Sequence, residues 1–232
     1  RRYEQGLTGT LTLAIEPNAV MTLPTGVLGA YRSVRPGISL NLVTSSGVSA
    51  LESLTSGEVD GVVSIPMCDD SFEYASVLRE PLCIVIHAEQ LGATQANSPD
   101  HTTSQSALNQ LNGKVLCGVA REHPIEAQIC GYLARHGVFV TMCYDYPSAM
   151  LALEAARAGL GGCIMTAAAA SSFTAESGLV VVRLDAPDAE GSDPAGPPQW
   201  EVGITYRRDS SKAPMIADLV TYLRGASHAG GA

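Results

Sequence analysis

The sequence is short of aromatic and charged residues. Of its 232 residues, 5% are aromatic and 16% charged, whereas 46% are hydrophobic. This composition is typical of a globular protein and excludes a disordered or strongly solvated chain. The length suits one α/β unit or two intertwined lobes.

Positive charge is also scarce. The chain carries 14 Lys and Arg against 23 Asp and Glu, for a net charge of −9. Such a surface repels a phosphate backbone, so these residues alone are not expected to bind nucleic acid.

Long apolar runs and regular cysteine spacings are missing as well. No run approaches the roughly 18 residues that span a bilayer, and the start has no signal-peptide core, which predicts a soluble, cytoplasmic protein. The six cysteines form no C-x-x-C pair and no metal-ligand spacing, so no metal site is expected. Most lie in apolar runs, where a free thiol behaves as a small buried hydrophobe.

Alternating apolar patterns predict two β-α-β-α-β series. The first has strands at 10–15, 38–42 and 59–65, and the second has strands at 115–119, 138–142 and 162–165. Ser148 is expected to cap the helix before the last of these. Strands in this order are parallel, and ligands of such sheets bind beyond the carboxyl ends of the strands. A further strand is expected at 200–206 and a helix from Pro214, with a disordered tail at 225–232.

Motifs of catalysis are lacking. There is no phosphate-binding G-x-x-x-x-G-K-[ST], no G-x-S-x-G nucleophile elbow and no H-x-x-x-H pair. The glycines at 159–162 lack the spacing of a dinucleotide site and are better explained by helix termination. We therefore expect no enzyme and no cofactor.

Polar turns at the predicted strand ends are the candidate binding residues. In the first series these are Asn18 with Ala19 and Ser46 with Gly47, for which simple helix capping is the alternative. In the second series Arg121 can clamp a carboxylate and lies close to His123, although a solvated charged turn is the alternative. Tyr146 follows a strand and either flanks a ligand or only packs between lobes.

Several segments in order resemble one family. Residues 51–63, LESLTSGEVDGVV, match L-x-x-L-x-x-G-x-[LIV]-D-x-x-[LIV], and residues 151–161 are similar to a late L-V-x-A-G-x-G motif. With the LREPL segment at 78–82, they resemble the effector-binding domain of LysR-type transcription regulators over about residues 6–224.

The resemblance implies two Rossmann-like lobes joined by two crossover strands, a type II periplasmic-binding-protein-like α/β fold. Lobe I would comprise 6–66 and 205–224, and lobe II 67–204. A small effector would lie in the cleft between them, with contacts carried over by position to Asn18, Ala19, Ser46, Gly47, Ile65, Arg121, His123, Tyr146 and Thr166. Relatives often have Arg where this chain has Ile65, and Pro where it has Thr166.

The function implied is therefore effector sensing for transcription. The effector would be a small organic compound, with organic or aromatic acids as candidates, and it would change the arrangement of a dimer or tetramer. DNA would be held by an amino-terminal winged helix-turn-helix that this sequence does not include. Two alternatives stay open, a solute-binding protein of a transport system and a thiol-redox sensor using Cys117 or Cys130. Apolar neighbours favour inert thiols over the second alternative.

Overall fold

The structure is a computed structural model that describes residues 7–17, 19, 25–45, 47–67, 70–91, 105–118, 124–146, 148–171, 178–184 and 196–229. The chain divides into two compact units, Arg1–Arg79 with Glu201–Ala232 (unit 1) and Glu80–Trp200 (unit 2). It passes between them inside two strands, β4 (Phe72–His87) and β9 (Gln199–Arg207). Within the described ranges, no helix is long and apolar enough to span a membrane.

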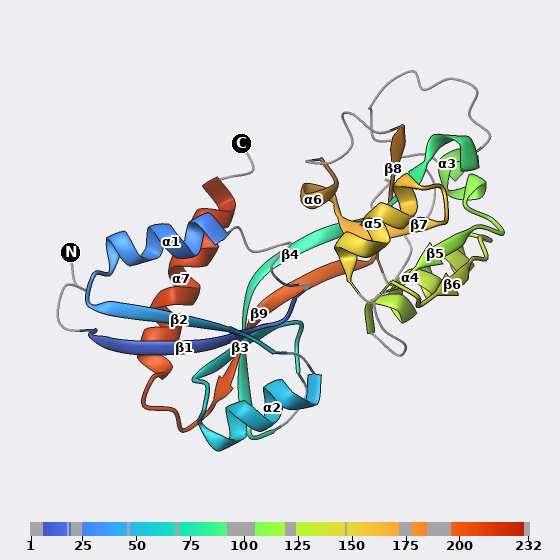
Figure 1. The fold of residues 1–232 in the computed structure, drawn as a ribbon. Helices are drawn as coiled ribbons and strands as arrows, with labels where there is room; N and C mark the ends of the chain where they lie inside the picture. The colour runs from blue at the N-terminus through green and yellow to red at the C-terminus, as the bar shows by residue number, and fades with distance from the viewer. Residues whose placement is uncertain are drawn as a thin grey trace. The chain divides into compact units, whose positions relative to one another are not determined.

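Unit 1 is built on a parallel sheet. The central strand β1 (Gly9–Ile15) pairs in parallel with both β2 (Ile38–Thr44) and β3 (Gly61–Ser64), and β9 runs antiparallel to β3. Helix α1 (Thr25–Val34) connects β1 to β2, and α2 (Gly47–Ser56) connects β2 to β3 on the other side of β1. Right-handed crossovers in opposite directions place helices on opposite faces, as Figure 1 shows for α1 and α2.

The segment that most resembles the LysR family forms α2, its end and β3. Leu54 and Val59 are buried in a core cluster with Ala14, Ala50 and Val62. Between them Gly57 ends the helix with a φ of +79°, a conformation that favours glycine. The Asp60 carboxylate accepts a hydrogen bond from the Thr12 amide at 2.8 Å. The motif residues therefore have structural roles: Gly57 ends α2, and Asp60 connects the start of β3 to β1.

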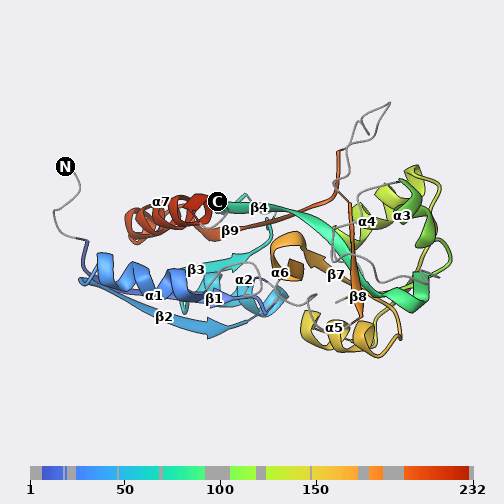
Figure 2. The same ribbon diagram turned by 90° about the horizontal axis from the view of Figure 1, so that it is seen from above.

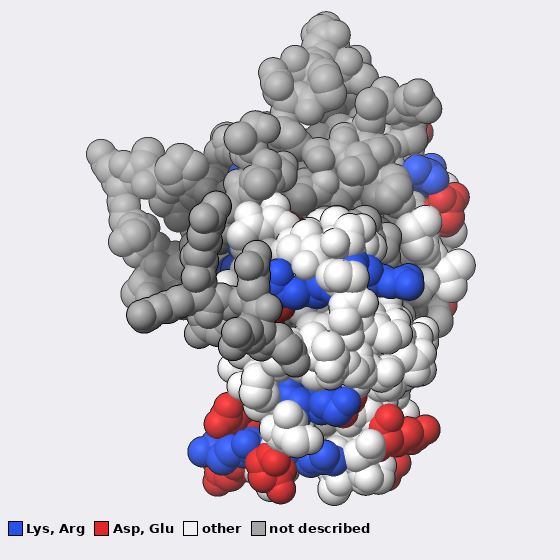
Figure 3. Space-filling model, turned by 90° about the vertical axis from the view of Figure 1, so that its left-hand side faces the viewer, with Lys and Arg blue, Asp and Glu red and all other residues white. Residues whose placement is uncertain are grey.

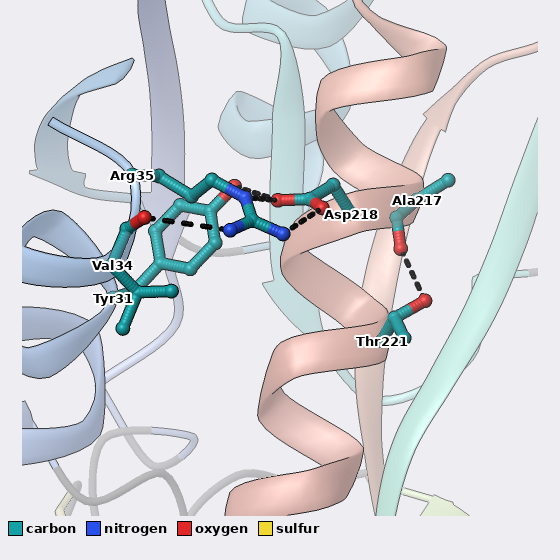
Figure 4. A network of polar contacts seen from close by, with 6 residues as sticks. All are labelled: Tyr31, Val34, Arg35, Ala217, Asp218 and Thr221. Atoms are coloured by element: carbon teal, nitrogen blue, oxygen red, sulfur yellow. Dashed lines mark hydrogen bonds and ion pairs between the residues drawn. The ribbon is translucent and has the colours of Figure 1, made fainter. Parts of the chain in front are cut away.

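A half-buried polar network joins α1 to α7 (Ala213–Ala229), shown in Figure 4. The Arg35 guanidinium donates to both Asp218 carboxylate oxygens at 2.9 Å, and the Tyr31 hydroxyl donates to the same carboxylate at 2.8 Å. Tyr31 is fully buried, and its ring packs against Tyr222. The hydrogen bond from Arg35 is the main reason that the pKa of Asp218 lies below its ordinary value.

The last helix is longer than the sequence suggested. It continues to Ala229, past the Gly225 from which a disordered tail was expected. Gly225 has open space around it and adopts ordinary helical geometry, and the Ala, Ser and His residues after it are tolerated in helices.

Unit 2 repeats the plan of unit 1. Its central strand β5 (Val115–Cys117) pairs in parallel with β6 (Thr141–Cys143) and β7 (Gly162–Thr166), while β4 is antiparallel to β7 and to β8 (Leu179–Arg183). The helices α4 (Pro124–Arg135) and α5 (Ala149–Arg157) lie on opposite sides of β7 in Figure 2. The shorter helices are η2 (Ala88–Leu91), α3 (Gln105–Gln110) and α6 (Ala167–Ser171).

Two local expectations for this unit are confirmed. Ser148 caps α5, because its side chain accepts a hydrogen bond from the Leu151 amide at 3.3 Å. Gly159 ends the turn after α5 with a φ of +71°, so helix termination is the correct interpretation of that glycine. One expectation is shifted. Strand β6 begins at Thr141 instead of 138, because the Val138 amide bonds back to the Leu133 carbonyl at the end of α4.

Both signs of charge are visible on one face of unit 1. Figure 3 shows a row of Lys and Arg side chains across the middle of this face, and Lys, Arg, Asp and Glu side chains together at its lower end. Ion pairs of this unit include Arg207 with Asp209 at 3.8 Å and Arg208 with Glu73 at 4.0 Å.

The α1–α7 network predicts a loss of stability in the Asp218→Asn variant. The free energy of unfolding should fall by about 2 kcal/mol, because charge-assisted hydrogen bonds from Arg35 and Tyr31 are weakened in a half-buried place. The lowered pKa of Asp218 means that its contribution is complete above about pH 4 and is lost as the pH falls through that pKa.

Urea unfolding from pH 7 down to pH 3 measures this effect, with Thr221→Ala as the control on the same helix. Thr221 is exposed and bonds only to the Ala217 carbonyl among the contacts in Figure 4. A difference between wild type and Asp218→Asn that grows toward low pH would contradict the assignment.

The close approach of β9 to β4 predicts that Gly203→Ala is destabilising. A Cβ at position 203 would overlap the Ala75 carbonyl oxygen and lie 2.6 Å from the Tyr74 ring. The expected loss is about 1–3 kcal/mol by chemical unfolding, because backbone cannot yield as a flexible side chain does. Gly225→Ala is the matched control. It lies in open space in α7 and should instead gain up to about 1 kcal/mol.

Candidate functional site

The parallel strands of unit 1 end at a common edge. The Glu16 amide, directly after β1, donates to the Val63 carbonyl at 3.0 Å, and the Ser45 amide, directly after β2, donates to the Ile15 carbonyl at 3.3 Å. The turns after β1, β2 and β3 are thereby held next to one another, as the strand order of the sequence predicted.

Glu16 connects two of these turns. Its backbone carbonyl accepts from the Ala19 amide at 3.0 Å, and its carboxylate accepts from the Gly47 amide at 3.4 Å. Gly47 has a φ of +55° and is the first residue of α2. Its amide therefore belongs to the amino-terminal, positive end of the helix dipole. Burial raises the pKa of Glu16, while the bond from Gly47 acts in the opposite direction.

Serine hydroxyls complete the edge of unit 1. The Ser45 and Ser49 hydroxyls lie 2.9 Å apart, both near solvent. Ser64 at the end of β3 is fully buried and donates to the Ile65 carbonyl at 2.8 Å. The Ile65 side chain, directly after Ser64, is half-buried.

In unit 2, Thr166 joins β7 to α6 and to β4. Its hydroxyl oxygen accepts from the Ala169 amide at 3.2 Å and is hydrogen-bonded to the Glu80 carboxylate. Leu82 lies opposite Thr166 in the ladder, which brings Glu80 within reach. Burial raises the pKa of Glu80 more than the Thr166 bond lowers it. Thr166 therefore supplies a helix cap in place of the proline that relatives often have here.

Tyr146 follows β6 and lies near the Cys143 thiol and the Asp145 carboxylate. The Cys143 thiol lies 3.3 Å from the Asp145 carboxylate, and the Gly118 amide donates to the Cys143 carbonyl at 2.8 Å. Tyr146 is half-buried, and its pKa is raised by desolvation first and then by Cys117, Cys143 and Asp145.

Glu126 lies at the same edge of unit 2. It belongs to the first turn of α4 and is 6% exposed, although it carries a carboxylate. Neither carboxylate oxygen has a hydrogen-bond partner within the part of the chain that the structure describes. The carboxylate lies against Gly118, whose missing side chain leaves room for it.

Thiols form a row across the unit 2 sheet. Cys117 on β5 lies opposite Cys143 on β6 and Cys163 on β7. Burial raises the pKa of Cys117 to about 11, and it raises the pKa values of Cys163 and Cys130 as well. Burial therefore favours the unreactive thiol form of Cys117, Cys130 and Cys163.

The structure places some of the candidate binding residues and not others. Ala19, Gly47 and Ile65 lie at the strand ends of unit 1, and Tyr146 and Thr166 at those of unit 2. Asn18, Ser46, Arg121 and His123 lie outside the described residues. Ala19 is fully buried, so only its backbone is available for contact.

Sequence reasoning missed the carboxylates Glu16, Glu80 and Glu126. Glu16 could have been found as the residue directly after a buried strand. Glu126 resembled an ordinary acidic residue of a first helical turn, and no pattern in the sequence shows that it is buried. Among the described residues there is no group of three or more His, Cys, Asp or Glu that could hold a metal. The arrangement offers hydrogen-bonding groups at strand ends and is suited to binding.

A protein-family model decides the affiliation of the chain. The model of the LysR substrate binding domain matches residues 4–227. The chain belongs to this family. It is thus an effector-binding domain of a LysR-type transcription regulator, with the type II periplasmic-binding-protein-like fold expected from the sequence. No protein with a curated description matches the sequence significantly.

Solved structures of LysR-type regulators share this fold. The reduced form of the OxyR2 regulatory domain from Vibrio vulnificus is 19% identical with a TM-score of 0.68, and the match covers 97% of this chain and 99% of that one. A mutant OxyR from Corynebacterium glutamicum is 21% identical with a TM-score of 0.74, covering 97% and 66%. Full-length CbnR in complex with its target DNA is 17% identical with a TM-score of 0.69, covering 94% and 70%.

Proposed function

We propose that this LysR domain senses a small organic effector through the strand-end groups of its two units. The observation that carries the proposal is the family match over residues 4–227, together with turns that present a helix amide, hydroxyls and carboxylates at the edges where α/β sheets bind ligands. The proposed contacts are Asn18, Ala19, Ser46, Gly47, Ile65, Arg121, His123, Tyr146 and Thr166.

The effector would act by shifting a conformational equilibrium. Binding changes how copies of the regulator associate, as a dimer or tetramer, and so changes transcription from DNA held by a winged helix-turn-helix. In this proposal the domain works in the cytoplasm and catalyses nothing. The family match favours it over a solute-binding protein of similar fold. Sedimentation of the regulator only as a monomer at high concentration would contradict the mechanism.

Isothermal titration against a metabolite panel tests the proposal. One class of compound should bind wild type, and the Asn18→Ala and Arg121→Ala variants should bind it about tenfold more weakly or worse, because each removes a polar contact. Thr221→Ala, on the exposed side of α7, is the control. Unchanged affinity in both site variants would show that the site is wrong, and a panel without any binder would count against effector sensing.

Redox sensing is the second candidate, since several similar structures are OxyR regulators and one of them holds H2O2. The thiols of this chain give little support, because burial raises the pKa values of Cys117, Cys130 and Cys163. A sensor needs an accessible thiolate.

Thiol titration distinguishes the two candidates. With a pKa of about 11, only about one Cys117 side chain in a thousand is a thiolate at pH 8, so Cys117 should react with a disulfide reagent far more slowly in the native protein than in the unfolded one. Mass mapping after a short labelling pulse identifies the modified positions. Rapid native labelling of Cys117 or Cys130 would favour the redox function.

A further inference from the structure

Glu126 has the properties of a binding group and lacks those of a structural one. It is 94% buried, as the complement of its 6% exposure, and both of its carboxylate oxygens are without a hydrogen-bond partner among the described residues. Burying a carboxylate without a compensating partner destabilises the folded protein. Such an unsatisfied group in a folded protein requires an explanation, and a functional role is one.

Helix capping does not account for this carboxylate. An acidic residue in a first helical turn stabilises the helix by facing the free amides or solvent. Glu126 instead lies against Gly118, just past the carboxyl end of β5: a Cβ added there would overlap Oε1 and lie 2.8 Å from Cδ. The carboxylate therefore occupies the edge of the unit 2 sheet where ligands of this fold bind.

The surroundings indicate what would compensate the charge. The Met142 methyl group also lies beside Gly118, 3.0 Å from the place of that added Cβ, and Cys130 is one helical turn after Glu126. Within the part of the chain that the structure describes, these neighbours are apolar or weakly polar and carry no positive charge. Arg183 ends β8 at this edge, but β7 and β4 separate β8 from β5, and Arg183 already has interactions of its own.

Other acidic groups lie along the same edge of unit 2. Glu80 has one carboxylate oxygen buried without a hydrogen-bond partner in the described part of the chain, and Asp145 follows β6. Both add negative potential where a ligand would bind. Among the described groups at this edge, these carboxylates would repel an anion and attract a cation.

We propose that Glu126 receives a positively charged, hydrogen-bond-donating group of the effector. This inference rests on the proposed function and names the ligand class, an organic cation such as a primary ammonium or an amidinium on a small apolar body. The charged head pairs with the Glu126 carboxylate, and the apolar body packs against Met142. The organic acids first considered would not suit this part of the site.

A stability measurement without ligand tests the unpaired state of Glu126. Glu126→Gln keeps the shape and removes the buried charge, so the Tm of the unliganded protein should rise by about 3 °C or more. Glu52→Gln, an exposed glutamate of α2, is the control and should leave the Tm unchanged. If Glu126 were paired in the folded protein, Glu126→Gln would lower the Tm, and that result would overturn the proposal.

Binding of matched probes tests the ligand class. Benzylamine, benzamide and benzoate share a ring and differ in head-group charge, and calorimetry should show benzylamine binding wild type most tightly. Glu126→Gln should weaken benzylamine binding about tenfold or more, and Gly118→Ala should do so as well, because its methyl group takes the place of the carboxylate. Glu52→Gln should bind benzylamine as wild type does.

The outcomes separate this inference from the function on which it rests. Equal benzylamine affinity in wild type and Glu126→Gln, no benzylamine binding at all, or tighter binding of benzoate would each overturn the cation assignment. If a compound of the metabolite panel still binds through Asn18 and Arg121, effector sensing stands without it. If the panel holds no binder, the proposed function fails as well.

Discussion

Parallel strands that end at one edge of a sheet are the constraint on which both units depend. In unit 1 the backbone bonds from Glu16 to Val63 and from Ser45 to Ile15 hold the turns after the strands together. In unit 2 the pairing of β5 with β6 and β7 does the same for the regions of Gly118, Tyr146 and Thr166. Residues far apart in the sequence thereby become neighbours without any covalent link, which allows a binding site to be built from short turns.

Local signals made much of this architecture predictable. The alternation of strands and helices indicated parallel sheets, Ser148 marked a helix start, and Gly159 marked a helix end. These features depend on a few neighbouring residues and on backbone geometry, which sequence patterns record directly. The strand-end positions Ala19 and Gly47 could be found for the same reason, whereas Thr166 came only from the family resemblance. Their contact with an effector stays a prediction.

Features that depend on tertiary burial could not be predicted. Nothing in the sequence around Glu126 distinguishes it from an exposed acidic residue such as Glu52, because its burial depends on tertiary packing, in which its carboxylate lies against Gly118. The same holds for the raised pKa of Glu80, whose hydrogen-bond partner Thr166 lies 86 positions away in the numbering of the chain. The sequence pattern can therefore locate a binding site at the strand ends, but the buried charged groups of that site are seen only in the packed structure.

The chain passes from unit 1 to unit 2 in β4 and returns in β9, so unit 2 is synthesised in full before unit 1 is complete. Unit 2 is one continuous stretch, Glu80–Trp200, whereas unit 1 needs Glu201–Ala232 as well as its first part. On the ribosome, β3 emerges long before β9, its antiparallel neighbour, and α1 emerges long before Asp218, the partner of Arg35. The strands of unit 1 are therefore synthesised first, but their sheet is completed last. Until β9 has been made, β3 has an unpaired edge that could pair with a strand of another chain.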